Sequence, residues 1–279
     1  MGHTSFVWSV AALSDNTLAS GSADNTIRIW STTSCQTIQI LMGHTDWVRA
    51  IGALPDGTLA SASYDKTVRI WDTKSGKMMR LLTGHTSYIL SLAVLTGEGI
   101  LASGSYPEII IWNVTSEQIL HKLMGHTNYV YSLVGLPDDM LASGSFDTTI
   151  RIWSLKSGKT LRVLTGHTAL VNCLSFLMNE TDKILISGSD DKTIKMWNVN
   201  SGQQLNTLIG HTGWVESVIL LSDGTLVSGS ADTTIRIWHD EVRVLTGHTS
   251  YVYSLALLPD NILSSGSRDN TIRLWHDFE

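Results

Sequence analysis

Two stretches of sequence decide the fold: LASGSADNTIRIW at residues 18–30 and LMGHTDWVRAI at residues 41–51. Variants of both recur along the whole 279-residue chain. The dipeptide Gly-His occurs seven times, and successive copies are 41, 41, 41, 41, 44 and 37 residues apart. A tryptophan follows each histidine after 27 residues, or after 30 residues in the fifth copy. A fixed period of this size is typical of repeat proteins.

Three residue types keep a fixed place in the repeat. The histidines are His3, His44, His85, His126, His167, His211 and His248. The tryptophans are Trp30, Trp71, Trp112, Trp153, Trp197, Trp238 and Trp275. Six repeats also have an aspartate six residues before the tryptophan, and these are Asp24, Asp65, Asp147, Asp191, Asp232 and Asp269.

The repeat reads as four short strands. In the first repeat, β-branched and aromatic residues fill runs at 6–13, 17–21, 26–30 and 37–41, separated by Ser, Asp, Asn and Gly. No segment sustains a helical period. A four-stranded sheet this small cannot cover both of its faces alone, whereas sheets stacked radially around an axis cover one another. Seven repeats therefore predict an all-β, seven-bladed propeller.

The repeat resembles that of the WD40 family over the whole chain, because LASGSADNTIRIW and LMGHTDWVRAI match the family signature almost residue for residue. The resemblance implies one WD40 β-propeller domain over residues 1–279. Its repeats are expected at about 2–42, 43–83, 84–124, 125–165, 166–209, 210–246 and 247–279. It also implies a non-catalytic scaffold that binds a protein or peptide.

The same resemblance implies a structural role for the repeated polar residues. In the family, the Gly-His histidine, the turn aspartate, a strand serine and the tryptophan form one hydrogen-bonded chain. Which of the two serines in each Ser-Gly-Ser takes part stays open. Catalysis needs one asymmetric constellation, whereas this set recurs in every repeat. The sequence also has no phosphate-binding glycine loop and no metal-ligand spacing, so we expect no enzyme activity, no cofactor and no metal.

The third repeat departs from the pattern. It reads Ser-Tyr-Pro-Glu-Ile at residues 105–109, where the other repeats carry the turn aspartate. We therefore expect His85 to lack its carboxylate. One interpretation is drift in a blade that its neighbours support. The other is that Tyr106 and Pro107 reshape the rim for recognition. The fifth repeat has three extra residues around 178–183, which predict a longer loop.

The last repeat has no run that could form a fourth strand, so its blade is predicted to have three strands, with 271–275 as an exposed edge. Exposed edges invite pairing with another chain. The alternatives to a peptide-binding scaffold are therefore a truncated or engineered propeller without a natural ligand, and association through this open edge. We expect a monomer, with an edge-strand dimer as the alternative.

The best candidates for partner contacts lie on the narrow face, which we define as the face where the first strand of each repeat begins. In the family, two residues at the start of that strand and one before the turn aspartate reach this face. Besides the seven repeated tryptophans, only Phe176 and Phe278 are aromatic residues outside these positions. We expect many of the first residues of each pair to pack between blades. The candidate contacts are Trp8, Arg49, Tyr64, Tyr106, Tyr131, Phe146, Asp190, Glu216, Tyr253 and Arg268.

Composition and charge argue against several other classes of protein. The formal net charge is −6, and no basic run is present to neutralise phosphates, so we expect no nucleic-acid partner. No apolar run approaches the roughly 20 residues of a membrane helix. Cys35 and Cys173 fit no disulfide framework or ligand pattern. With no secretory signal expected at the start, we predict a cytoplasmic protein that does not bind membranes.

Overall fold

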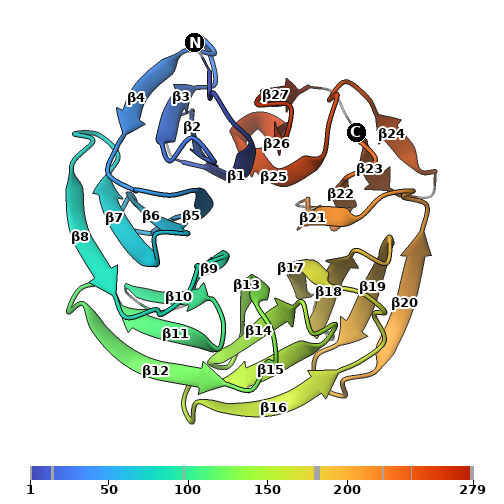
Figure 1. The fold of residues 1–279 in the computed structure, drawn as a ribbon. Helices are drawn as coiled ribbons and strands as arrows, with labels where there is room; N and C mark the ends of the chain where they lie inside the picture. The colour runs from blue at the N-terminus through green and yellow to red at the C-terminus, as the bar shows by residue number, and fades with distance from the viewer. Residues whose placement is uncertain are drawn as a thin grey trace.

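The protein is a ring of seven antiparallel sheets around a common centre (Figure 1). The computed structural model describes residues 2–13, 16–95, 97, 99–178, 183–221, 223–239 and 241–276. Within these residues six sheets have four strands and the last has three. The predicted seven-bladed, all-β propeller with a three-stranded last blade is thus confirmed. The expected extra loop of the fifth repeat falls largely on residues 179–182, outside the described residues.

Each blade is a meander in which successive strands lie side by side, from the centre of the ring outward (Figure 1). The innermost strands are β1 (Val7–Ala12), β5 (Val48–Ala53), β9 (Ser91–Val94), β13 (Val130–Leu136), β17 (Val171–Met178), β21 (Val215–Leu220) and β25 (Val252–Leu258). The second strands are β2 (Thr17–Ser22), β6 (Thr58–Ser63), β10 (Ile100–Gly104), β14 (Met140–Ser145), β18 (Lys183–Ser189), β22 (Leu226–Ser230) and β26 (Ile262–Ser267).

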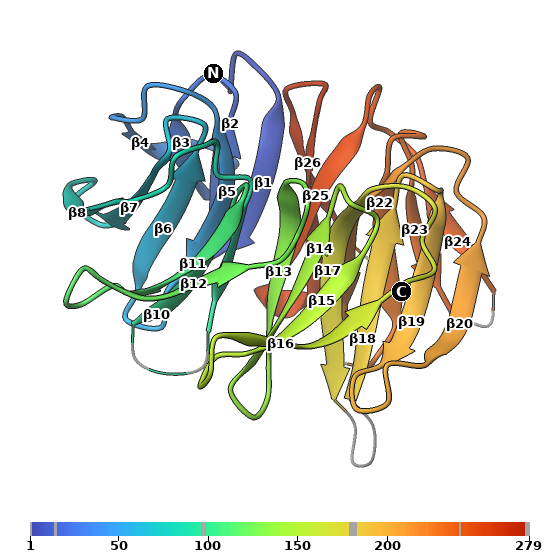
Figure 2. The same cartoon turned by 60° about the horizontal axis from the view of Figure 1, so that its bottom comes forward.

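The third strands are β3 (Ile27–Ser31), β7 (Thr67–Asp72), β11 (Glu108–Asn113), β15 (Ile150–Ser154), β19 (Thr193–Asn198), β23 (Ile235–Trp238) and β27 (Ile272–Trp275). The outer strands are β4 (Thr37–Leu41), β8 (Met78–Thr83), β12 (Gln118–Met124), β16 (Lys159–Leu164), β20 (Gln204–Ile209) and β24 (Arg243–Leu245). A 3-10 turn, η1 (Pro259–Asn261), precedes β26. Inner strands such as β1, β13 and β17 run through the thickness of the ring (Figure 2), and the narrow face is the face at which the inner strands begin.

The hydrophobic core is divided among the seams between neighbouring blades. Ala60, Val68 and Ile70 of the second blade pack with Ile110 and Trp112 of the third in one buried cluster. Because each sheet buries both faces against its neighbours, the second strands are apolar or small almost throughout. The ring therefore gains most of its apolar burial between blades, and each blade needs both neighbours.

Glycine on the second strands permits the close approach of the blades. A Cβ atom on Gly266 would lie 2.8 Å from Val7 Cγ1 of the first blade, and one on Gly144 would lie 2.7 Å from Val171 Cγ1. Both distances are too short for carbon atoms, so glycine is required at these two seams, whereas the second blade accommodates the buried Ala62 at the equivalent position. The contact between Gly266 and Val7 belongs to the seam that closes the ring.

Serines on the inner strands add hydrogen bonds across these seams. The Val10 N–H donates to Ser254 Oγ at 3.1 Å, which links the first and last blades. Ile51 N–H to Ser9 Oγ, Leu174 N–H to Ser132 Oγ, and Leu255 N–H to Ser217 Oγ repeat the arrangement at 3.3, 2.9 and 3.1 Å. An inner strand has N–H groups that its own sheet cannot bind, so a serine from the next blade satisfies them.

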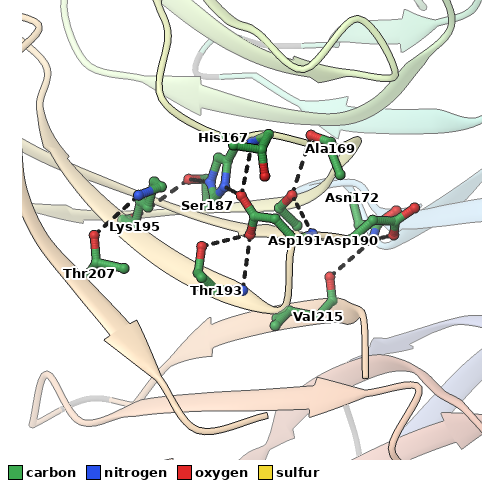
Figure 3. Close-up of polar contacts among 12 residues, drawn as sticks. His167, Ala169, Asn172, Ser187, Asp190, Asp191, Thr193, Lys195, Thr207 and Val215 are labelled. Carbon is green, nitrogen blue, oxygen red and sulfur yellow. Dashed lines mark hydrogen bonds and ion pairs between the residues drawn. The ribbon is translucent and has the colours of Figure 1, made fainter. Parts of the chain in front are cut away.

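A buried serine hydroxyl joins three elements within each blade. In the fifth blade His167 Nδ1 donates to Asp191 Oδ2 at 2.7 Å, and His167 Nε2 lies 2.7 Å from Ser187 Oγ (Figure 3). The Trp197 indole N–H donates to the same Ser187 Oγ at 2.8 Å. All seven blades have the serine-centred part of this network. Its serines are Ser20, Ser61, Ser103, Ser143, Ser187, Ser228 and Ser265.

This network resolves the choice between the two serines, because the first of each pair lies at its centre. The second serine serves the turn, as Ser22 Oγ accepts the Asp24 N–H at 3.1 Å. A threonine, which the sequence did not single out, completes the set: Thr26 Oγ1 donates to Asp24 Oδ1 at 2.6 Å. Burial alone would raise the pKa of these aspartates, but the hydrogen bonds from histidine and threonine outweigh it and lower their pKa, to about 2 for Asp269.

The third blade has the serine but not the carboxylate. His85 Nε2 lies 2.6 Å from Ser103 Oγ, while its buried Nδ1 has no hydrogen-bond partner in the described chain. The expected loss of the carboxylate is thus confirmed. Burial, with a smaller contribution from Lys122, lowers the pKa of His85 to about 3. Glu108, which is buried here, pairs instead with Lys122 Nζ at 3.1 Å.

The seam serines predict that Ser254→Ala weakens ring closure. The change leaves the Val10 N–H without its acceptor, so the free energy of unfolding should fall by about 1 kcal/mol. Ala50 occupies the equivalent place in the second blade, so alanine is compatible with the backbone there. Urea denaturation measures the change, and a variant as stable as the wild type would show that water replaces this hydrogen bond at no cost.

The network predicts that Asp147→Ala destabilises the fourth blade. His126 Nδ1, which now donates to Asp147 at 2.7 Å, would be buried without an acceptor, at a cost of roughly 1–3 kcal/mol. Tyr106→Ala is the control, because it changes an exposed residue in the corresponding turn of the third blade, which has no aspartate. Thermal unfolding should separate the two variants; equal stabilities would contradict a structural role for the carboxylate.

The low pKa of His85 predicts a contribution to acid sensitivity. Its pKa is about 3 in the folded protein against 6.5 for a free histidine, so the unfolded chain binds an extra proton between these values. Stability from this group is therefore complete above about pH 6.5 and is lost as the pH falls toward 3. In His85→Gln, the free energy of unfolding should decrease less between pH 7 and pH 4 than in the wild type. Parallel pH curves would rule this contribution out.

Candidate functional site

Each of the seven inner strands carries one side chain at an equivalent position near its narrow-face end, and we call the place where these side chains meet the central mouth. Six of these side chains are large or polar, and the third blade contributes the buried Leu90. The six are Trp8, Arg49, Tyr131, Asn172, Glu216 and Tyr253. All six are partly buried, because strands from every blade converge at the centre of the ring (Figure 1).

A continuous row of aromatic rings crosses the narrow face from the third blade to the sixth by way of the first. Neighbouring ring centroids in this row are 4.3–6.0 Å apart. We call it the aromatic arc, and in spatial order its members are Tyr88, Tyr64, Trp47, Trp8, Tyr253, Tyr251 and Trp214. Tyr64 and Tyr88 are stacked, at 4.7 Å and 14°. Spacings and angles of this kind are the preferred geometries of aromatic pairs.

The remaining candidates lie beside the arc. Arg268 is exposed, and its guanidinium lies 5.0 Å from the ring centres of both Phe6 and Tyr251. Tyr131 and Phe146 form a separate pair at 6.4 Å, and Tyr106 lies 5.7 Å from Tyr129. The aromatic residues among the predicted contacts thus lie either in the arc, as Trp8, Tyr64 and Tyr253 do, or in these two pairs.

The predicted order of exposure within each pair is wrong for three blades. Trp47, Tyr88 and Trp214, the first residues of their pairs, are 38%, 44% and 44% exposed. Of the predicted contacts, only Tyr106, Phe146 and Arg268 are exposed, and the other seven are partly buried. Both residues of a pair flank a buried valine or isoleucine, such as Val48, and so point away from the seam. The second lies farther into the ring, where neighbouring strands crowd it, and alternation alone does not reveal this difference.

Three charged residues stand at the mouth among these rings. The Arg49 guanidinium lies 4.8 Å from the Trp8 ring centre and 5.9 Å from that of Tyr131, in the geometry of cation–π contacts. The Asn172 side-chain amide donates to Asp190 Oδ1 at 2.6 Å and to the Val215 carbonyl at 3.2 Å (Figure 3). The Asn172 amide thus connects the fifth blade to the sixth at Val215, the residue before Glu216.

Burial at the mouth changes the acidity of its groups. Desolvation raises the pKa of Glu216 to about 7, with Arg49 opposing the shift and Asp190 adding to it. Desolvation likewise raises the pKa of Asp190, against the hydrogen bond from Asn172. The pKa of Tyr253 rises to about 12 through desolvation and then through the nearby Glu216. Glu216 is thus a carboxyl group that exchanges its proton near neutral pH.

No group of three or more His, Cys, Asp or Glu side chains in the described ranges is arranged to hold a metal ion. The seven histidines of the repeat lie one per blade. Among the described residues no helix has the length and apolar character needed to cross a membrane.

Comparison with known families agrees with the fold. The family model described as WD domain, G-beta repeat matches residues 1–31, 35–72, 76–113 and 240–276, and a model described as WDR41, a β-propeller, matches residues 116–255. No curated protein gives a significant match to the chain. The repeat matches cover more than half of the 279 residues, and the blades, the Gly-His turns and the buried networks agree with them: the chain belongs to the WD40 repeat family.

Proposed function

We propose that this protein is a non-catalytic scaffold that binds a peptide or protein segment on its narrow face. WD40 propellers generally act as protein-interaction scaffolds and are generally not enzymes. The observation that supports this face is the aromatic arc, because its seven rings are in contact across five blades and three of them are exposed. Tyrosine and tryptophan bury a large area at a small entropic cost and dominate binding hot spots.

The rigidity of the scaffold supports the same proposal. In six blades the narrow-face turn is fixed by the aspartate, threonine and histidine hydrogen bonds, so the rings beside these turns are held in place before a partner arrives. Pre-organised contact residues lose little conformational entropy on binding. The repeated histidines are committed to serine hydroxyls, and to aspartates in six blades, which leaves them no catalytic role. We place the protein in the cytoplasm, where free thiols such as Cys35 and Cys173 are kept reduced.

Selection of random peptides on the immobilised protein tests this proposal. Selected peptides should bind the wild type, and Trp47→Ala with Tyr88→Ala should weaken them by about 100-fold, because two hot-spot rings are removed. The control is Leu161→Ala with Val163→Ala on the outer strand β16, where both side chains are also exposed. Failure to select any peptide, or equal loss of binding in both double variants, would contradict binding at the arc.

A further inference from the structure

The outer strands of six blades follow one sequence pattern. Each has a leucine that pairs with an isoleucine or valine of the third strand, as Leu41 does with Ile27. These leucines are Leu41, Leu82, Leu123, Leu164, Leu208 and Leu245. A polar residue precedes each leucine by two places, and an apolar residue precedes it by three. The pattern of an outer strand is therefore apolar, polar, any residue, leucine.

The leucine of each outer strand also fills the seam with the next blade. Leu41 packs in one cluster with Leu59 and Trp71 of the second blade. The other five leucines belong to equivalent clusters, each with a leucine and a tryptophan of the following blade. An outer strand thus completes its own sheet and covers its neighbour.

The seam between the last blade and the first has a cavity at this place. Its cluster joins Leu18 and Trp30 of the first blade to Ile272 and Leu274 of β27, and it contains no outer-strand residue of the last blade among the described ones (Figure 1). The same four side chains line a cavity of about 240 Å³. Ile272 is partly exposed, whereas its equivalents in the other six blades are at most 1% exposed. A leucine side chain fits such a space, since a cavity of roughly 150 Å³ already holds a benzene molecule.

A turn of the first blade lies beside the cavity, and in other seams the equivalent turn touches the outer strand. A Cβ atom on Gly202 would lie 3.2 Å from Leu164 and 3.3 Å from Arg162 of the preceding blade. Cys35 has the place of Gly202 in the first blade, lines the cavity and is exposed. A strand that entered the cavity would therefore lie against the Cys35 side chain.

The open edge also has a cation without a counter-ion. Arg273 of β27 is exposed and makes no ion pair with the described residues, whereas Arg151, its equivalent in the fourth blade, is partly buried. The residue before the leucine would lie opposite Arg273, as Val163 lies opposite Arg151. Opposite charges attract across a strand pair, so an acidic residue is complementary at that position.

We propose that β27 and this cavity bind an extended segment of a partner protein, which adds antiparallel to β27 as the fourth strand of the last blade. Its sequence pattern is apolar, polar, acidic, leucine. The leucine lies opposite Ile272 in the cavity between Leu18 and Trp30, and the acidic residue lies opposite Arg273. The segment continues the sheet and the seam as outer strands do in the other six blades, and unpaired strand edges bind extended chains in this way.

A partner segment fits this edge better than a second copy of the chain does. In a second copy the outer-strand leucines are already paired and packed in their own seams, so no strand with this pattern is free among the described residues. The open β27 of a second copy carries Arg273 itself, and pairing the two edges would bring like charges together.

Protection of Cys35 from iodoacetamide tests the proposal on the full chain, because mass spectrometry distinguishes it from the buried Cys173. The probe is the acetylated and amidated peptide of residues 158–165, an outer strand of the chain itself, with Val163→Glu. It should slow the alkylation of Cys35. Adding Leu164→Asp to the peptide should weaken binding by about tenfold or more, because the buried leucine is lost. Lysine in place of the new glutamate should weaken it by about threefold.

Variants of the chain test the position of the strand. Ile272→Lys should abolish the protection, because a charged side chain at an edge position opposes pairing. The matched control is Leu161→Lys on β16, which is also an outermost strand and where the side chain is exposed. Thermal unfolding checks that both variants fold, and the peptide changes test the proposal without altering the protein.

Protection that requires both the peptide leucine and Ile272 would support this site. Equal protection by the leucine and aspartate peptides, or protection by neither, would overturn it. A concentration-dependent dimer in sedimentation velocity that protects Cys35 without peptide would overturn the partner assignment in favour of a second copy. None of these outcomes bears on peptides selected through Trp47 and Tyr88, so this proposal and that of the narrow face fail separately.

Discussion

A fully buried serine hydroxyl holds each blade together. It accepts the indole N–H of the third strand and meets the imidazole nitrogen of the preceding turn, so it joins three segments that are distant in sequence. Because this contact takes Nε2, the histidine must direct its Nδ1–H at the aspartate, and the aspartate then fixes the turn through threonine. This chain of hydrogen bonds therefore fixes the position of every narrow-face turn that has an aspartate. A network satisfied throughout is rigid, whereas a partly satisfied one is costly.

Much of this could be predicted from sequence, since the relevant signals repeat. Seven copies of Gly-His and tryptophan in register gave the number of blades, and the short alternating runs placed the strands of the first blade to within about a residue. The missing aspartate of the third repeat correctly indicated an orphaned histidine. The resemblance to the WD40 family supplied the hydrogen-bonded order of the network, which spacing alone does not contain.

The remaining features of the fold and of the site depend on contacts between neighbouring blades. The sequence of a single repeat does not show which residues make those contacts. The inner-strand serines look like ordinary strand residues until Ser254 is seen to bind the N–H of Val10, 244 residues away. Trp47 and Arg49 flank the same buried Val48, so alternation puts both on one side of the strand without saying which is deeper. The sequence did not select Asn172 as a contact residue. Its role is visible only in the structure, where its side-chain amide lies between Asp190 and the sixth blade.

The charged mouth depends on this rigidity. Asp190 immediately precedes Asp191, which the His167 network holds in place, and the Asp190 N–H itself donates to the Leu170 carbonyl at 3.0 Å, so the backbone that carries Asp190 is fixed. Asn172 then orients the carboxylate, and the seam between the fifth and sixth blades holds Glu216 nearby. A flexible loop would turn both carboxylates into water and escape the cost of desolvation. A rigid ring cannot relax in this way, so the cost of desolvating the two carboxyl groups persists in the folded protein.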